Sequence, residues 1–370
     1  MFSSRMKFAA KVLPPIITRL WINFDQFGIT SCLIGDAVMA RAEITKHLIE
    51  HHGFDTVAVE ADWPDAESVD RYVRLRPGVK SKLDPSPEPA FRRFPTWMWR
   101  NKEMQEFVHW MRDHNAHLPK ERRAGFYGLD LYSMGLSIQA IIKYLSRVDP
   151  PMAKLARQRY GCLQLWVEDP SQYGLATLTN PRMESCEKNV IQMLRDLLNK
   201  RLEYSANEHN GEEFHSSEQN AYLVADAEAY YKAMYSRSAD SWSLRDSHMF
   251  ETLRRLLNVK SESSKAVVWA HNSHIGDARY TSMGTRRGEL NVGQLCRENL
   301  GQENVALVGC FMHTGTVAAA HDWDEDVQVM KVNPSRPDSW EYVAHESGIP
   351  SFLLDLRPNQ ADPELRRALA

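Results

Sequence analysis

A short apolar run that ends abruptly in two histidines constrains the fold of this chain more than any other feature. Residues 266–270 read Ala-Val-Val-Trp-Ala, and the polar loop His271-Asn-Ser-His274 follows them directly. A brief apolar run bounded by polar residues is typical of a buried strand. We therefore predict a strand whose end carries both histidines into a loop, where their imidazole groups can take part in chemistry.

Three further apolar runs end in acidic residues in the same way. They occupy residues 29–34, 54–60 and 124–130, and they end at Asp36, at Glu60 with Asp62, and at Asp130. Between the first two, residues 41–52 carry apolar side chains at helical spacing, and Gly53 is well placed to end a helix. A strand, a helix and a strand joined by short loops indicate a parallel sheet. Because ligands of such sheets bind at the carboxyl ends of the strands, we expect the polar ends to converge in one site.

The remaining sequence predicts an α/β fold with a large helical part. Residues 149–265 contain long amphipathic segments, whereas residues 305–309, 326–332 and 351–356 again read as strands. We predict a mostly parallel central sheet that is flanked by helices and interrupted by a helical insertion. The expected segments are an α/β half over residues 1–150, a helical insertion or subdomain over 151–265, and a return to the sheet over 266–370.

Composition argues against several classes of partner and location. The net charge is −3 with both signs interspersed, which does not fit a nucleic-acid partner. No apolar run approaches the roughly 18 residues of a membrane span, so we expect a soluble protein without a membrane partner.

Five scattered cysteines without a C-x-x-C pair favour reduced thiols and a cytoplasmic location. The basic, acid-free first 24 residues weakly resemble a targeting segment, although ordinary surface and strand sequence is the favoured interpretation. Nothing in the sequence indicates an oligomeric state.

The histidines and carboxylates are compatible with two chemistries. In the first, His271 or His274 pairs with a carboxylate and acts as a general base on water, because imidazole titrates near neutrality. Arg41 or Arg245 then stabilises the negative charge that develops on the substrate oxygen. In the second, both histidines and a carboxylate bind zinc or a similar ion. We favour the first, because an H-x-x-H pair in a loop, without the glutamate of a helical H-E-x-x-H, is a weak metal signal.

Structural interpretations compete with function at several of these positions. Glu60 also fits a buried partner for Arg41, and for Asp130 alone a structural role is the favoured interpretation. Ser243 and Asp246 fit a helix cap, which leaves the nearby Arg245 and His248 unexplained. The aromatic block that contains Trp97 and Arg100 fits either a ligand-facing wall or core packing beside solvated arginines, and we favour the core.

Six blocks of the chain form an ordered set. They are Arg41-Ala-Glu-Ile-Thr, Gly53-Phe-Asp-Thr-Val-Ala-Val-Glu-Ala-Asp-Trp63, Phe94-Pro-Thr-Trp-Met-Trp-Arg100, Phe126-Tyr-Gly-Leu-Asp130, Ser241-Trp-Ser-Leu-Arg-Asp-Ser-His-Met249 and Val268-Trp-Ala-His-Asn-Ser-His274. Together they resemble the erythromycin esterase family, and within it the branch once labelled succinoglycan biosynthesis proteins, from about residue 20 onward. The resemblance implies an α/β fold with helical elaboration and ester hydrolysis without a metal or other cofactor, in which a histidine activates water and a glutamate supports it.

The chain departs from the family pattern at both ends. The first family motif reads approximately G-E-A-S-H-G-T-H-E-F-Y, and its first histidine is the proposed base, but here Gly35-Asp36-Ala37 runs directly into residues 38–41. That histidine has no counterpart, whereas Asp36 matches the acid of the motif. The chain also stops at Ala370, sooner than the pattern predicts.

Residue by residue, the resemblance leads to one principal expectation and two alternatives. We expect an impaired hydrolase of a small-molecule ester or lactone. The alternatives are a catalytically inactive binding protein that retains the site and, third, a metal-dependent hydrolase. The expected catalytic residues are His271, His274, Glu60, Arg41 and Asp36, and the expected substrate-binding residues are Asp130, Arg245, His248, Trp97 and Arg100.

Overall fold

A five-stranded parallel sheet forms the centre of the molecule. The computed structural model describes residues 20–23, 35–93, 95–206, 211–235, 238–260, 263–322 and 324–356. The sheet has the strand order β3-β2-β4-β1-β5, and every pairing in it is parallel. Its strands are β1 (Leu20–Asn23), β2 (Thr56–Asp62), β3 (Gly125–Asp130), β4 (Ala266–Ala270) and β5 (Ala306–Val308). The prediction of an α/β fold with a mostly parallel sheet is confirmed.

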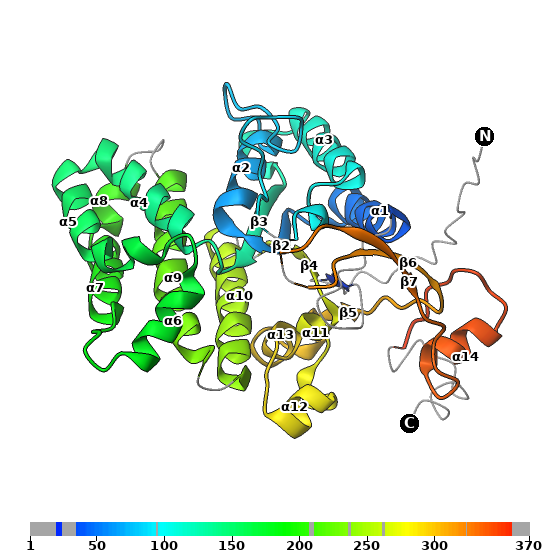
Figure 1. The fold of residues 1–370 in the computed structure, drawn as a ribbon. Coiled ribbons are helices and arrows are strands. Elements are labelled where there is room, and N and C mark those ends of the chain that lie inside the picture. Colours follow the sequence, from blue (N-terminus) through cyan, green and yellow to red (C-terminus); the bar gives the residue numbers. More distant parts are fainter. Residues whose placement is uncertain are drawn as a thin grey trace.

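Alternation along the strands distributes side chains between two hydrophobic clusters. Val57 and Val59 of β2 and Trp269 of β4 belong to one cluster, and Ala58 and Val268 belong to the other. This period of two is the geometry of a strand that is buried on both faces. The first cluster is covered by α1 (Gly35–His52), α2 (Trp63–Val73) and α3 (Lys102–Ala116), which lie together on one side of the sheet (Figure 1).

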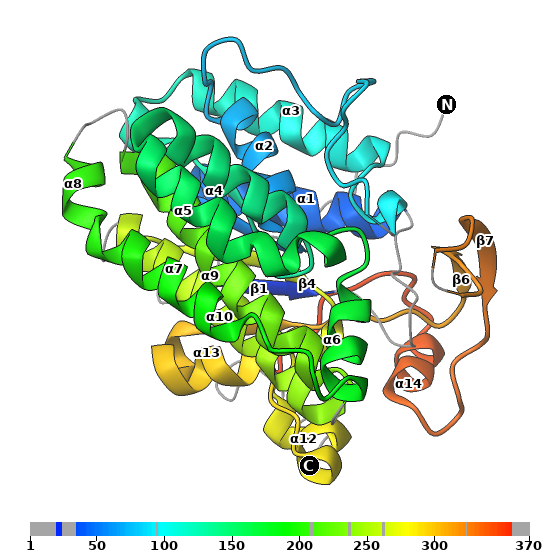
Figure 2. The same cartoon turned by 60° about the vertical axis from the view of Figure 1, so that its left-hand side comes forward.

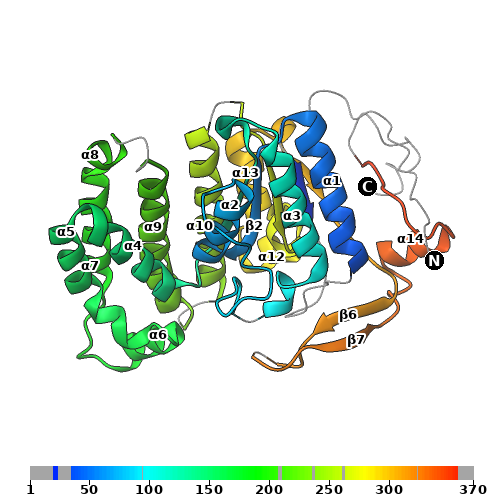
Figure 3. The ribbon, with the colours of Figure 1, turned by 90° about the horizontal axis from the view of Figure 1, so that it is seen from above.

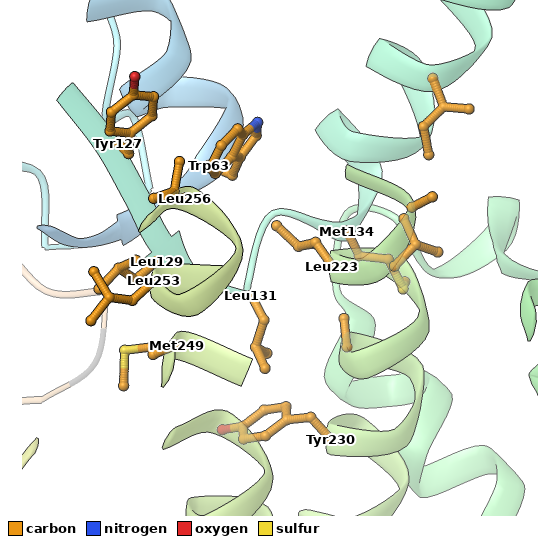
Figure 4. Close-up of a cluster of buried hydrophobic side chains, with 14 of the residues drawn as sticks. Trp63, Tyr127, Leu129, Leu131, Met134, Leu223, Tyr230, Met249, Leu253 and Leu256 are labelled. Carbon is orange, nitrogen blue, oxygen red and sulfur yellow. The ribbon is translucent and has the colours of Figure 1, made fainter. Parts of the chain in front are cut away.

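Most of the other helices gather at one end of the molecule (Figures 1 and 3). They are α4 (Met134–Val148), α5 (Pro150–Tyr160), α6 (Pro170–Thr179), α7 (Glu187–Asn199), α8 (Arg201–Ser205) and α9 (Gly211–Ala233). The long helix α10 (Ser238–Lys260) lies between this group and the sheet. Its Met249, Leu253 and Leu256 share a cluster with Leu129 of β3 and Tyr230 of α9 (Figure 4). The predicted helical insertion is therefore present, and α10 joins it to the sheet.

The chain after β4 forms smaller elements. The short helices α11 (Asn272–Ile275), α12 (Ser282–Arg287) and α13 (Val292–Leu300) follow β4, and α12 and α13 lie below β1 and β4 in Figure 2. An antiparallel ribbon of β6 (Gly315–Ala319) and β7 (Gln328–Val332) then projects from the body, and α14 (Trp340–Glu346) follows it. The half-exposed strand predicted near residues 326–332 is confirmed as β7. The strand predicted at residues 351–356 is wrong, because this segment has no regular structure and its apolar side chains are exposed.

The start of helix α1 differs from the prediction, whereas its end agrees with it. Residues 29–34 lie outside the described residues, and Gly35 and Asp36 begin helix α1 instead of ending a strand. The reason is that the buried helical face already starts at Val38 and continues through Ala42, Thr45 and Ile49. Gly53 ends this helix with a φ of +69°, as predicted.

The expectation of reduced thiols is wrong for one pair of cysteines. Cys162 and Cys186 form a disulfide in the helical part. They are separated by 24 residues, so no short motif identifies the pair, and only the packing of α5 to α7 brings them together.

Among the described residues, no helix is long and apolar enough to cross a membrane.

Candidate functional site

Three adjacent strands bring polar groups to the same edge of the sheet. β2 lies between β3 and β4, and the last paired residues of these strands are close to Glu60, Asp130 and His271. The backbone N–H of His271 donates to Oε2 of Glu60 over 2.8 Å. The carboxyl ends therefore converge as the strand pattern predicted, and the contact joins residues that are 211 positions apart in the sequence.

Helix α10 places an arginine at the centre of this edge. Arg245 donates to both carboxylate oxygens of Asp130, over 2.9 and 2.7 Å, and to Oε1 of Glu60 over 2.7 Å. Its guanidinium also lies 4.9 Å from the ring centre of Tyr132, which follows β3. A guanidinium shared by two buried carboxylates is held in one orientation, because its planar donors match the carboxylate oxygens.

His274 is enclosed by charged groups on both sides of its ring. Its Nδ1 lies 2.9 and 3.0 Å from the two oxygens of Asp246. Its Nε2 lies 3.2 Å from Oε1 of Glu60 and 3.1 Å from a terminal nitrogen of Arg245. The ring of Trp242 stacks on the imidazole at 4.5 Å between centres, with an angle of 4° between the planes. His274 is 2% exposed, so solvent hardly reaches these contacts.

These contacts shift the pKa values of both members of the central pair. Burial alone lowers the pKa of His274, but Asp246 and Glu60 outweigh it and raise the value to about 9. Burial alone raises the pKa of Glu60, but the charges of His274 and Arg245 outweigh it and hold the value well below its usual range. These shifts favour an ionised Glu60 and a protonated His274 at neutral pH, while burial raises the pKa of Asp246.

His271 has a different environment. Its Nδ1 accepts a hydrogen bond from the backbone N–H of Ser273 and lies 2.6 Å from the hydroxyl oxygen of the same residue. Because Nδ1 accepts, the neutral ring carries its proton on Nε2. His271 is only partly buried. In this tautomer the imidazole carries an N–H donor at Nε2.

Arg41 and Asp36 were predicted beside these residues. Arg41 of α1 is buried, and its guanidinium lies 5.2 Å from the ring centre of Trp269 in β4. Burial lowers the pKa of Arg41 to about 10, while Cys310 and Glu60 act in the opposite direction. Arg41 therefore adds positive charge next to Glu60. The backbone of Asp36 lies in the first turn of α1, and its side chain lies outside what the structure describes.

The remaining predicted residues have other neighbours. His248 contacts Asp226 of α9, with 2.6 Å between Nδ1 and the carboxylate. Trp97 donates from its indole nitrogen to the carbonyl of Ala318 in β6, over 3.1 Å. Arg100 is exposed after the 3-10 turn Thr96–Met98. The structure thus brings Glu60, Asp130, Arg245, His271 and His274 together, and in the contacts of the described residues these three are not part of that group.

Sequence reasoning missed the roles of Asp246 and Trp242. The interpretation of Asp246 as a helix cap is wrong, because α10 begins at Ser238 and Asp246 lies inside it. Asp246 instead accepts from the backbone N–H of Val292 over 3.0 Å and contacts His274. The spacing of Trp242, Arg245, Asp246 and Met249 would have revealed one helical face.

A metal does not fit the arrangement of the two histidines. Asp246 occupies Nδ1 of His274, and Glu60 and Arg245 face its Nε2. The backbone of Ser273 occupies Nδ1 of His271. Within the described part of the chain, no group of three or more histidine, cysteine, aspartate or glutamate residues could hold a metal ion.

The fold is similar to that of three solved structures. A succinoglycan biosynthesis protein matches with a TM-score of 0.69 and 16% identity, over 90% of this chain and 75% of its own. A Bacillus cereus protein matches with a TM-score of 0.68 and 18% identity, over 95% of this chain and 79% of its own. A mutant of the erythromycin esterase EreC in its open conformation matches with a TM-score of 0.62 and 14% identity, over 90% of this chain and 82% of its own. At these identities the likeness concerns the fold.

A comparison of the sequence with family models goes further than the fold. The model described as erythromycin esterase matches residues 49–370, which is most of the chain. A family of this kind supports a hydrolase-like function in general and a small-molecule substrate. The chain belongs to the erythromycin esterase family.

Proposed function

We propose that this protein is a slow, metal-independent hydrolase of a small-molecule ester or lactone. The observation that carries the proposal is the convergence of Glu60, Arg245, His271 and His274 at the carboxyl ends of adjacent parallel strands. In ester hydrolysis the water oxygen bonds to the acyl carbon, and the acyl carbon–oxygen bond then breaks. One water proton is lost, and the alcohol oxygen gains one. Two tasks follow, which are stabilising negative charge and moving a proton.

The site is well suited to the first task. The Nε2–H of His271, in the tautomer set by Ser273, can donate to a carbonyl oxygen as it becomes negative. Arg245 and His274 both contact Oε1 of Glu60, and their positive charges keep the edge from being strongly negative. Donors that are held in place before the reaction are effective because they need no reorganisation during it.

The second task is where we expect the enzyme to be weak. Among the described residues at this edge, the pKa of His274 is raised to about 9, which favours the protonated ring, and the depressed pKa of Glu60 makes it a poor base. His271 presents a donor and not an acceptor. The family motif supplies a histidine for this step, and this chain has no counterpart to it. Loss of a positioned general base typically slows a reaction by a factor of about 10² to 10⁴.

A panel of lactones and aryl esters tests the proposal. We expect measurable turnover above the uncatalysed rate that falls by about tenfold or more in His271→Ala, because one oxyanion donor is lost. The matched control is His109→Ala, since His109 pairs with Asp84 at an exposed site in α3. Equal rates in the wild type, His271→Ala and His109→Ala would contradict the proposal.

A catalytically inactive binding protein is the second candidate, and the absence of a neutral base among the described site residues favours it. Thermal unfolding separates the two functions, because a ligand that binds only the folded state raises the melting temperature. Stabilisation by a lactone in the panel, together with no hydrolysis above background, would favour the binding protein. Turnover that depends on His271 would favour the hydrolase.

A further inference from the structure

The environment of His274 differs from that of a catalytic acid or base. Asp246 faces its Nδ1 from α10, and Glu60 faces its Nε2 from β2. Asp246 is fully buried and is itself fixed by the backbone N–H of Val292. The stacked ring of Trp242 restricts rotation of the imidazole and favours a positive charge over its face. A base needs an open nitrogen within reach of a substrate proton, and both nitrogens here face protein groups.

The balance of buried charges around His274 also favours a protonated ring. Apart from Asp62, which pairs with Arg93 over 2.9 Å, three buried carboxylates contribute negative charge to this edge, those of Glu60, Asp130 and Asp246. Arg245 contributes one positive charge directly, and the charge of Arg41 acts on Glu60. The other titratable group beside the ring is His271, whose centre is 6.5 Å away. A protonated His274 supplies the third positive charge, and buried charges persist only when they are balanced in this way.

We propose that Asp246 is a positioning residue which, with Glu60, holds His274 as a cation at neutral pH, so that His274 acts as a charge and not as an acid or base. This inference rests on the proposed function only for its catalytic meaning, because the state of the ring can be measured without turnover. The competing arrangement is a neutral His274 that donates from Nδ1 to Asp246 and accepts from Arg245 at Nε2. The two arrangements differ by one proton on Nε2.

Nuclear magnetic resonance of protein labelled with ¹⁵N-histidine distinguishes these states. The ring nitrogens of imidazolium and neutral imidazole have different shifts, and the signal of His274 among the 14 histidines is identified by its loss in His274→Gln. We expect both ring nitrogens of His274 to be protonated at pH 7.5 in the wild type. A neutral ring there would overturn the inference, whatever the variants do.

The variant Asp246→Asn tests the role of the carboxylate. The asparagine keeps an oxygen for the N–H of Val292, and it then presents an amide donor to Nδ1 of His274, which favours the neutral ring. We expect the proton affinity of His274 to fall by at least tenfold. The matched control is Asp226→Asn, because Asp226 pairs with His248 of the same helix away from this edge. It should leave the His274 signals unchanged. Unchanged proton affinity in Asp246→Asn would overturn the inference.

The pH profile of hydrolysis adds a readout that a purely structural role would not move. If the wild type hydrolyses esters, its profile should lack a titration between pH 6 and 8 that belongs to His274, and Asp246→Asn should introduce one. A protonated ring without any turnover would leave the inference standing while the proposed hydrolase fails. Turnover with a neutral His274 in the wild type would overturn the inference and leave the proposed hydrolase standing.

Discussion

Helix α10 takes part in two histidine–aspartate contacts that differ in their surroundings. On the face toward the sheet, Asp246 contacts His274, and the carboxylate is 0% exposed. On the face toward α9, His248 contacts Asp226, whose carboxylate is 42% exposed. In the first contact a second carboxylate, that of Glu60, faces the other nitrogen of the imidazole. In the second, solvent reaches the acid and screens the interaction.

The difference shows that the surroundings of a histidine determine its role more than its nearest partner does. A half-exposed aspartate can orient an imidazole without fixing the protonation state of the ring. Around His274, two carboxylates lie on opposite sides of the buried ring, and Arg245 is fixed between Glu60 and Asp130. These contacts stabilise the charged imidazole in the folded protein. Stability measurements can therefore test whether the two faces of α10 differ in this way.

The largest effect is expected for Arg245→Met. This change leaves the buried Glu60 and Asp130 without their shared cation, and removal of one partner from a buried charge pair typically costs about 3 to 5 kcal/mol. Urea unfolding measures the loss. The control is Arg254→Ala on the same helix, since Arg254 contacts Glu251 in an exposed pair that contributes about 1 kcal/mol or less. Similar losses in the two variants would contradict the view that α10 has one structural charged face.

A smaller effect is expected from pH, through His274. Its pKa is about 9 in the folded protein against 6.5 for the ordinary group, so folding favours the protonated ring. The stabilisation is fully present below pH 6.5 and is lost as pH rises through about 9. Its upper limit is roughly 3 to 4 kcal/mol, because each tenfold change in proton affinity corresponds to about 1.4 kcal/mol. The free energy of unfolding, measured from pH 6 to 10, should fall more in the wild type than in His274→Gln. Parallel curves would show that the ring is neutral at pH 7.

The fold was largely predictable because short stretches of sequence indicate where its strands lie. The apolar runs at β2, β3 and β4 end in polar residues, and Gly53 marks the end of α1, so neighbouring residues carry the signal. The failures have a physical reason as well. The run at residues 351–356 is as apolar as a strand, but no partner strand lies beside it among the described residues, and hydrophobicity alone cannot show that.

The site was predictable only in part, because half of it depends on contacts distant in sequence. The polar ends of the strands identified Glu60, Asp130 and His271 without knowledge of the strand order. The role of Asp246 required the packing of α10 on the sheet, which the sequence does not encode within a short window. Its similarity to a capping residue concealed it, since an acid near serines in a helical segment satisfies both interpretations.

The smallest effect is expected for Asp226→Ala, and it completes the comparison. The carboxylate of Asp226 is partly exposed, so its removal should cost about 1 kcal/mol or less, the value of one screened interaction. Asp246→Ala removes the acceptor of both His274 and the N–H of Val292 in a site without solvent, and its cost should exceed that of Asp226→Ala by at least about 2 kcal/mol. Both free energies come from urea unfolding at pH 7. Equal costs would mean that burial does not separate the two contacts, and that the charge of His274 is set by something other than Asp246.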